Sequence, residues 1–108
     1  MLVIVVENVA PRLRGRLGVR LLEVRAGVYV GRAGKRLRER IWAEVIAGVD
    51  EGNAVMAFNA TGEQGFRVET CGTNRRVPVD WLGVQLVAFE PPTEPAETTV
   101  QLGRKPRR

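Results

Sequence analysis

The sequence predicts an α+β fold in which two helices cover one face of a mostly antiparallel sheet. Three observations support this prediction. A continuous apolar, β-branched run from Leu2 to Val6 is typical of a buried central strand. Apolar residues then recur at helical spacing in two separate segments. The second half of the chain consists mainly of short apolar or alternating runs separated by glycine-containing turns. The length of 108 residues fits one domain.

The first helix is predicted from Pro11 to about Leu22, because proline is well tolerated in the first helical turn, where its missing N–H is not needed. Its apolar residues recur at the spacing of a helix that packs on a core; they are Leu13, Leu17, Leu21 and Val24. Gly15 and Gly18 lie in mid-helix, where each costs about 1 kcal/mol relative to alanine. Such a pair suggests that something packs or docks closely there, and we expect packing against a neighbouring element rather than docking of a partner to explain it.

The segment Ala26 to Gly31 is bounded by glycines and predicts a strand. A second helix is predicted from about Ala33 to Gly48. Its expected core stripe is Leu37, Ile41, Trp42, Val45, Ile46 and Val49. A ferredoxin-like core needs one more strand before this helix, and the segment from Leu22 to Gly31 supplies it if the chain bends at Gly27.

Three further strands are predicted, from Ala54 to Phe58, from Phe66 to Thr70 and from Val84 to Phe89. The segment Thr73 to Asp80 contains Pro78 and is expected to be a loop. The predicted order is therefore β-α-β-α-β-β-β. Residues 1–90 are expected to form the domain, and residues 91–108, which open with three prolines and end in a basic cluster, are expected to form a flexible basic tail.

The composition excludes several classes of site. The chain contains no histidine, which removes the usual general base, the most common zinc ligand and every Ser-His or Cys-His nucleophile pair. With Cys71 as its one cysteine, the chain cannot form an internal disulfide, so we expect a reducing, cytoplasmic location. No segment has the length of a signal peptide or a transmembrane helix, so no membrane partner is expected.

The charge balance favours a polyanionic partner. The formal net charge is +5 and the sequence pI is about 10.6, which suits nucleic acid, although many basic proteins bind no specific polyanion. Arginine's planar guanidinium matches phosphate oxygens. The candidates for contacts to the nucleic-acid backbone are Arg12, Arg14, Arg16, Arg36, Arg75 and Arg76. The few aromatic residues fall mostly within apolar patterns, so a duplex held by its phosphates is a better prediction than single strands stacked on aromatic rings.

Three segments together carry a family resemblance. They are ENVAPRLRGRL from Glu7, LLEVRAGVYVG from Leu21 and GTNRRVPVDW from Gly72. In this order and at these spacings they resemble the Cas-two proteins of type I-E CRISPR systems. The pair Ile41-Trp42 and the run EGNAVMAF from Glu51 fit the same pattern. The resemblance covers about residues 1–90.

The resemblance implies a ferredoxin-like fold, a homodimer and a complex with the Cas-one integrase that acquires new spacers. In that complex the Cas-two dimer lies at the centre and the duplex part of the spacer DNA lies across it. The residues that match duplex-contacting positions are Arg12, Arg14, Arg36, Arg75 and Arg76. The part of the chain around Asp80 to Glu90 resembles the segment that docks on Cas-one. This adaptor role requires no cofactor.

The main alternative is a magnesium-dependent endonuclease that acts on single-stranded RNA or duplex DNA, as reported for many Cas-two relatives. Their proposed metal ligand is an aspartate at the end of the first strand, where this chain has Glu7 followed by Asn8. Magnesium binding demands strict geometry, and glutamate is one carbon longer than aspartate. Glu7 is therefore a candidate metal ligand and catalytic residue, with Mg²⁺ as the cofactor, although a role in capping the turn or pairing with an arginine is also open.

A third hypothesis is a free-standing ferredoxin-like protein that binds RNA or acts like a toxin. It is compatible with the fold, because this fold hosts many functions.

Cys71 is expected to be a small buried apolar residue rather than a nucleophile, because the chain has no histidine to activate its thiol.

Overall fold

The computed structural model describes residues 1–74 and 76–89. They form two helices and seven strands. In chain order these are β1 (Leu2–Glu7), α1 (Pro11–Arg20), β2 (Leu22–Arg25), β3 (Val28–Gly31), α2 (Lys35–Gly48), β4 (Asn53–Asn59), β5 (Phe66–Gly72), β6 (Arg76–Trp81) and β7 (Val84–Phe89).

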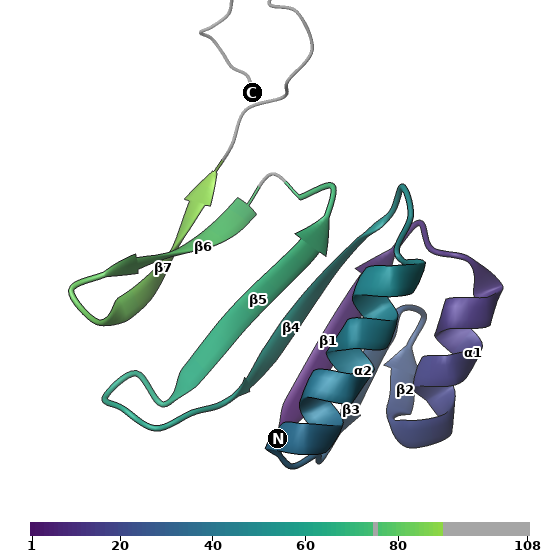
Figure 1. Ribbon diagram of the computed structural model, residues 1–108, viewed down its shortest axis with the longest axis horizontal. Coiled ribbons are helices and arrows are strands. Elements are labelled where there is room, and N and C mark those ends of the chain that lie inside the picture. Colours follow the sequence, from purple (N-terminus) through teal and green to yellow (C-terminus); the bar gives the residue numbers. More distant parts are fainter. Residues whose placement is uncertain (75, 90–108) are drawn as a thin grey trace, which may run out of the picture.

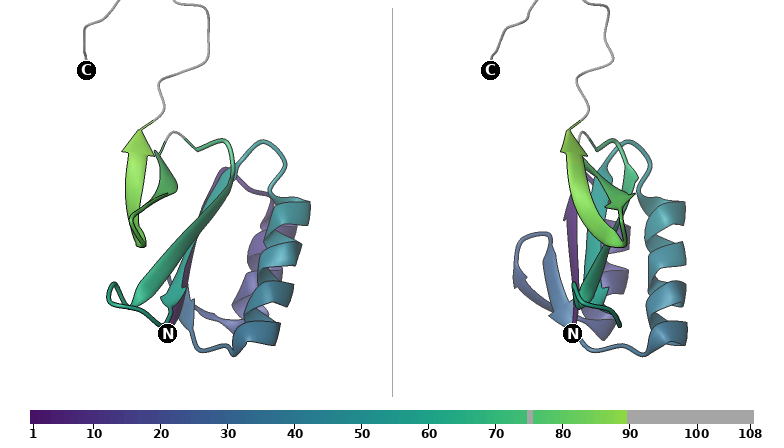
Figure 2. Two further views of the ribbon diagram at one scale, coloured as in Figure 1. Left: turned by 60° about the vertical axis from the view of Figure 1, so that its left-hand side comes forward. Right: turned by 90° about the vertical axis from the view of Figure 1, so that its left-hand side faces the viewer.

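The first five strands form one sheet in the order β2-β3-β1-β4-β5, and every neighbouring pair is antiparallel. Both helices pack on the same face of this sheet and run antiparallel to each other, and the other face carries no helix (Figures 1 and 2). This arrangement confirms the predicted α+β, ferredoxin-like fold.

The core lies between this sheet and the two helices. Along β1 the buried residues Leu2, Ile4 and Val6 alternate with the partly exposed Val3 and Val5, as the two-residue period of a strand requires. Ile4 lies at the centre of the sheet, because its register partners are Tyr29 on β3 and Met56 on β4, both buried. The prediction that Leu2 to Val6 forms a buried central strand is confirmed.

The chain reverses between β2 and β3 at Gly27, whose φ of 79° lies in the left-handed region that favours glycine. The Gly27 carbonyl accepts a hydrogen bond of 2.8 Å from the N–H of Val6, and a Cβ at Gly27 would lie 2.6 Å from the Val6 oxygen. The expected bend is therefore confirmed, and β2 supplies the additional strand of the ferredoxin-like core.

Three residues of the predicted core stripes lie at the surface instead. Val24 is 56% exposed because α1 ends at Arg20 and the chain continues as β2, an edge strand whose four residues are all exposed. On α2, Ile46 is 53% and Leu37 is 37% exposed. The narrower stripe of Ile41, Trp42, Val45 and Val49 is buried, because one sheet face and one neighbouring helix cover only part of a helix's circumference.

The expectation that Gly15 and Gly18 are required by close packing is wrong for the part of the chain that the structure describes. No atom lies within 4 Å of the position that a Cβ would take at either glycine. Both residues are exposed, because they lie on the side of α1 opposite the buried Leu13 and Leu17.

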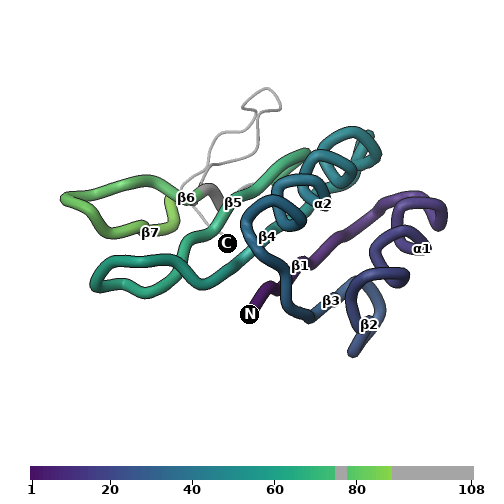
Figure 3. Tube along the Cα trace, turned by 60° about the horizontal axis from the view of Figure 1, so that its bottom comes forward, coloured from purple at the N-terminus to yellow at the C-terminus, as the bar shows by residue number. Residues whose placement is uncertain are grey.

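The segment expected as a loop from Thr73 to Asp80 contains most of a strand instead. β6 pairs with β7 in a separate two-stranded sheet, which lies beyond β5 and away from the helices (Figure 3). The hydrogen bonding of Gln85 explains why Pro78 is compatible with β6. The main-chain N–H and C=O of Gln85 bond to the side chain of Gln64, so they point out of the hairpin. Asp80 and Gln85, which face each other, are therefore a pair without hydrogen bonds between β6 and β7. Pro78 lies two residues from Asp80, so its missing N–H also points away from β7.

None of the helices in the described residues is long and apolar enough to cross a membrane. The predicted boundary after residue 90 and the predicted tail lie outside the described residues.

Candidate nucleic-acid interface

Helix α1 places its arginines on two different flanks. Arg12 and Arg16 line a pocket of about 550 Å³ together with the C-terminal end of α2, including Gly48 and Asp50. One turn further along the same flank, the guanidinium of Arg20 lies 3.3 Å from the Glu44 carboxylate on α2. The flank that faces α2 therefore carries a row of arginines spaced four residues apart.

Arg14 lies on the opposite flank of α1, because two helical positions correspond to a rotation of about 200°. Its main-chain carbonyl oxygen lies 3.3 Å from the hydroxyl of Tyr29 on β3. Arg14 is therefore fixed above the β2–β3 side of the sheet, while Arg12 and Arg16 border α2. The structure brings together Arg12 and Arg16, and separates Arg14 from them.

The N-terminus of α1 is favourable for an anion. It has no acidic residue in its first turn, and its N-cap residue Ala10 makes no side-chain hydrogen bond to the helix. The first turn of a helix carries a partial positive charge from its free N–H groups. We call this site, together with the side chains of Arg12 and Arg16, the α1 basic region.

A second group of cations lies at the N-terminus of α2. The side chains are all exposed, and the group, which we call the α2 basic region, consists of Arg32, Lys35, Arg36 and Arg40. No acidic residue lies in the first turn of α2, and its N-cap residue Gly34 provides no capping side chain. Because the two helices are antiparallel, the α2 basic region lies at the opposite end of the helix layer from Arg12 (Figure 1). The predicted residue Arg36 is therefore not part of the α1 basic region.

Most of the predicted arginines are free of acidic partners. Among residues 1–74 and 76–89, the ion pairs within 4.0 Å are Arg20–Glu44 and Arg67–Asp80. Within this part of the chain, Arg12, Arg14, Arg16 and Arg36 make no ion pair within 4.0 Å, and all four are exposed. Asp50 lines the same pocket as Arg12 and Arg16 but forms no ion pair with either. The guanidinium groups of these four arginines are therefore accessible to a polyanion.

The remaining two predicted arginines are Arg75 and Arg76. Arg75 lies outside the described residues, and the backbone of Arg76 begins β6 while its side chain is not described.

Glu7 lies on the opposite face of the sheet from these arginines. It ends β1 with the same parity as Val3 and Val5, whereas Leu2, Ile4 and Val6 face the helices. Its side chain is exposed, and none of the hydrogen bonds or ion pairs of the described residues involves it. The capping and pairing roles considered for Glu7 are therefore absent from the described part of the chain.

A metal ion at this position would have Glu7 as its ligand from this chain. Within residues 1–74 and 76–89, no group of three or more Asp, Glu or Cys side chains is placed to hold a metal ion. Asp50 and Glu51, which the sequence reasoning did not single out, line a pocket of about 710 Å³ with Asn8. Divalent cations usually need several oxygen ligands, so a site at Glu7 would have to draw further ligands from another molecule.

Cys71 is half-buried and packs against the core. Its burial raises the pKa of the thiol above its usual value, so the fraction of reactive thiolate is lowered. This environment agrees with the prediction that Cys71 is structural.

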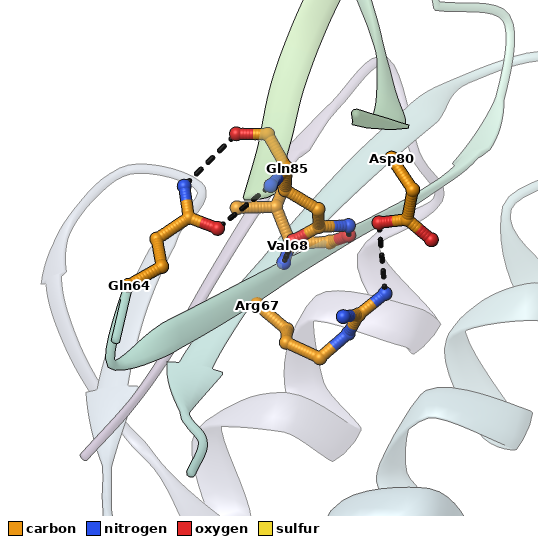
Figure 4. A network of polar contacts seen from close by, with 5 residues as sticks. All are labelled: Gln64, Arg67, Val68, Asp80 and Gln85. Carbon is orange, nitrogen blue, oxygen red and sulfur yellow. Dashed lines mark hydrogen bonds and ion pairs between the residues drawn. The ribbon is translucent and has the colours of Figure 1, made fainter. Parts of the chain in front are cut away.

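The sequence reasoning missed a set of polar contacts between β5 and the β6–β7 hairpin. Gln64, from the loop before β5, bonds through its side-chain amide to the main-chain N–H and C=O of Gln85, on β7 (Figure 4). The side-chain amide of Gln85 bonds in the same way to the main-chain N–H and C=O of Val68. The two glutamines are 21 positions apart, and an isolated glutamine has no sequence signature for such a contact.

A family of known proteins matches most of this chain. A family model described as CRISPR-associated protein (Cas_Cas2CT1978) matches residues 1–86, which include both helices, the complete five-stranded sheet and most of the hairpin. The match covers well over half of the 108 residues. The chain therefore belongs to the CRISPR-associated protein family of the Cas_Cas2CT1978 type.

Proposed function

We propose that this protein is a type I-E Cas-two protein that acts in CRISPR adaptation, as the central dimer of the Cas-one/Cas-two integrase, and binds duplex spacer DNA through its arginines. The observation that carries the proposal is the exposed set Arg12, Arg14, Arg16 and Arg36, which makes no ion pair with the described residues. Arginines of this kind suit the regularly spaced phosphates of a duplex. Membership of the CRISPR-associated family supports nucleic acid as this polyanion.

The helix-free face of the sheet supports a homodimer. Its central residues are apolar and only partly buried within one chain; they are Val3, Val5, Val28, Val30, Val55, Ala57 and Val68. An apolar face of this kind in a chain of this size is favourably covered by a second copy. Such a dimer would leave the arginines of the helix layer facing outward.

The β6–β7 hairpin supports a further protein partner. Trp81 is 64% and Leu82 is 90% exposed, and Val79, Leu86 and Val87 are also exposed. Exposed aromatic and aliphatic side chains of this kind are frequent anchors of protein–protein interfaces. The hairpin overlaps the segment from Asp80 onward that resembles the Cas-one docking segment of the family, so we assign Cas-one as its partner.

The magnesium-dependent endonuclease remains the alternative. It depends on Glu7, which lies on the same face as the proposed dimer interface, so that a second copy would bring a second Glu7. In the adaptor role the arginines are essential and this carboxylate is not. In the nuclease role the carboxylate is essential.

The experiment that separates the two functions is spacer integration with purified components. The reaction contains this protein, its Cas-one partner, a plasmid with a repeat, and a short DNA duplex. Wild type is compared with Arg12→Ala/Arg16→Ala, with Arg36→Ala, and with Glu7→Gln, which keeps the size of the side chain and removes its charge. A parallel assay with EDTA and without Cas-one measures nuclease activity.

The adaptor proposal predicts that integration falls strongly in the Arg12→Ala/Arg16→Ala variant and stays within about twofold of wild type in Glu7→Gln. If the Glu7→Gln variant instead loses integration although it still forms a dimer and binds Cas-one, the proposed adaptor function is wrong. Cleavage that EDTA and Glu7→Gln both abolish would establish the nuclease function, whereas cleavage that persists in Glu7→Gln would indicate a contaminating nuclease.

A further inference from the structure

Strand β5 is the edge of the five-stranded sheet, yet its outer main-chain groups are not all free. The Val68 N–H donates a hydrogen bond of 2.6 Å to Oε1 of Gln85, and the Val68 carbonyl accepts one of 2.8 Å from Nε2 of the same side chain. The primary amide of Gln85 therefore takes the place of the C=O and N–H that a residue of a sixth, antiparallel strand would offer to Val68.

The same arrangement is repeated between the side chain of Gln64 and the main chain of Gln85. The Gln64 side chain donates a hydrogen bond of 2.9 Å to the Gln85 carbonyl and accepts one of 2.7 Å from the Gln85 N–H. Gln64 thus closes the outer edge of β7, as Gln85 closes that of β5 (Figure 4). Two side-chain amides connect two sheets between which the described residues form no strand ladder.

The hairpin has little else to hold it in the described part of the chain. The buried core cluster and the residues packed against it include no residue of β6 or β7. The one ion pair across the junction, Arg67–Asp80, spans 3.5 Å and both side chains are substantially exposed, so solvent and salt screen it. The four amide hydrogen bonds of Gln64 and Gln85 are therefore the main specific contacts between the hairpin and the five-stranded sheet.

We infer that Gln64 and Gln85 form a releasable joint that holds the β6–β7 hairpin at the β5 edge and thereby sets the orientation of the side chains at its tip. When the joint is closed, the Val68 main chain is protected and the hairpin has one orientation. When it opens, both strand edges are freed and the hairpin can change its orientation relative to β5. The consequence for binding Cas-one depends on the proposed function, but the joint itself does not.

Amide hydrogen exchange of the protein alone, measured by NMR, tests the joint without DNA or Cas-one. Gln85→Ala should speed exchange of the Val68 amide by roughly tenfold, the effect expected for the loss of a hydrogen bond of ordinary strength. The Ile4 amide, in the central strand, should be unchanged and shows that the sheet is folded. The Thr70 N–H faces the same edge without a hydrogen bond to the described residues. Its exchange rate therefore serves as the reference for an unprotected amide at this edge.

Two matched variants make the test independent of misfolding. Gln85→Glu keeps the shape and the acceptor oxygen but loses the donor to the Val68 carbonyl, so exchange at neutral pH should lie between wild type and Gln85→Ala. Below the usual glutamic acid pKa of about 4.3 the carboxyl regains an O–H donor, and protection should return toward that of wild type at the same pH. Asp80→Asn, which breaks only the exposed ion pair, should change exchange less than twofold.

The inference is overturned if Gln85→Ala leaves Val68 exchange within twofold of wild type, or if Asp80→Asn has the larger effect. Binding of Cas-one to Gln64→Ala/Gln85→Ala then provides the second measurement. An altered affinity shows that the joint orients a functional surface. Faster exchange with unaltered affinity overturns the role in orientation, and no binding by wild type overturns the proposed function instead.

Discussion

The hydroxyl of Tyr29 lies 3.3 Å from the main-chain carbonyl oxygen of Arg14 and 3.2 Å from a carboxylate oxygen of Glu23. Its single proton is therefore shared between two acceptors, one on the arginine-bearing helix and one on β2. The Glu23 carboxylate also accepts a hydrogen bond of 3.1 Å from the N–H of Gly27. Through this contact the side chain of a fully buried residue connects α1 to the hairpin beneath it.

Replacing Tyr29 by phenylalanine should destabilise the fold by about 1–2 kcal/mol, because it removes the donor and leaves partly buried acceptors without it. The ring and its packing are retained, so the change reports on the hydroxyl. Urea denaturation followed by circular dichroism measures the difference in the free energy of unfolding. An unchanged midpoint would show that water replaces the hydroxyl without loss.

Stability should also fall at alkaline pH through the same residue. Burial and the neighbouring Glu23 carboxylate raise the pKa of Tyr29 above its ordinary value. The folded state therefore holds the proton more tightly than the unfolded state, so this contribution to stability is complete below about pH 10 and is lost as the pH rises through the higher folded-state pKa. Tyr29 is the only tyrosine, so tyrosinate absorbance reports its titration directly. A midpoint at or below pH 10 in the folded protein would contradict this prediction.

Replacement by alanine should raise the stability of the protein at Gly15 and Gly18 and lower it at Gly52. At Gly15 and Gly18 no atom lies within 4 Å of a new Cβ, so each change to alanine should stabilise α1 by about 0.5–1 kcal/mol. At Gly52 a Cβ would collide with the main-chain oxygens of Glu7 and Asn8, so Gly52→Ala should destabilise the protein strongly. Thermal unfolding of the three variants measures the contrast. Destabilisation by Gly15→Ala in the protein's native assembly would reveal a close neighbour from another molecule.

The two basic regions should contribute separately to DNA binding. If each arginine neutralises one phosphate, Arg16→Ala and Arg36→Ala should each lower the slope of log affinity against log salt by about 0.9, and the double variant by about 1.8. The losses should be alike for unrelated duplex sequences, because phosphate contacts carry no sequence information. Arg67→Ala is the matched control, since Arg67 pairs with Asp80 and lies on β5 outside both regions. An equal effect of Arg67→Ala would mean that net charge alone determines affinity.

The sequence predicted the parts of the fold that follow from periodicity. Leu2 to Val6, the two helices and β7 were identified because their apolar residues recur with the period of the element. The strand β6 was missed because Pro78 indicates a loop, and only the hydrogen bonding of Gln85 to Gln64 shows that the proline faces outward. Val24 and Ile46 were misplaced because periodicity identifies an apolar face but not how much of it the neighbouring elements cover.

The candidate site was predictable in its chemistry but not in its layout. Exposed arginines without acidic neighbours in sequence indicated a polyanion, and the candidates Arg12, Arg14, Arg16 and Arg36 form no ion pair with the described residues. Their division into two regions depends on the antiparallel packing of α1 and α2, which no local pattern encodes. The position of Glu7 on the opposite face depends similarly on which side of β1 the helices cover.

The outward-facing Pro78 has a consequence for how this protein behaves at high concentration. An exposed strand edge with an unbroken row of N–H donors is a template on which other chains can add strands and grow into fibrils. The edge of β6 lacks one donor in its middle, at Pro78. The gap at Pro78 therefore makes the edge of β6 a weaker template for the addition of another strand, in a hairpin that carries many exposed apolar side chains.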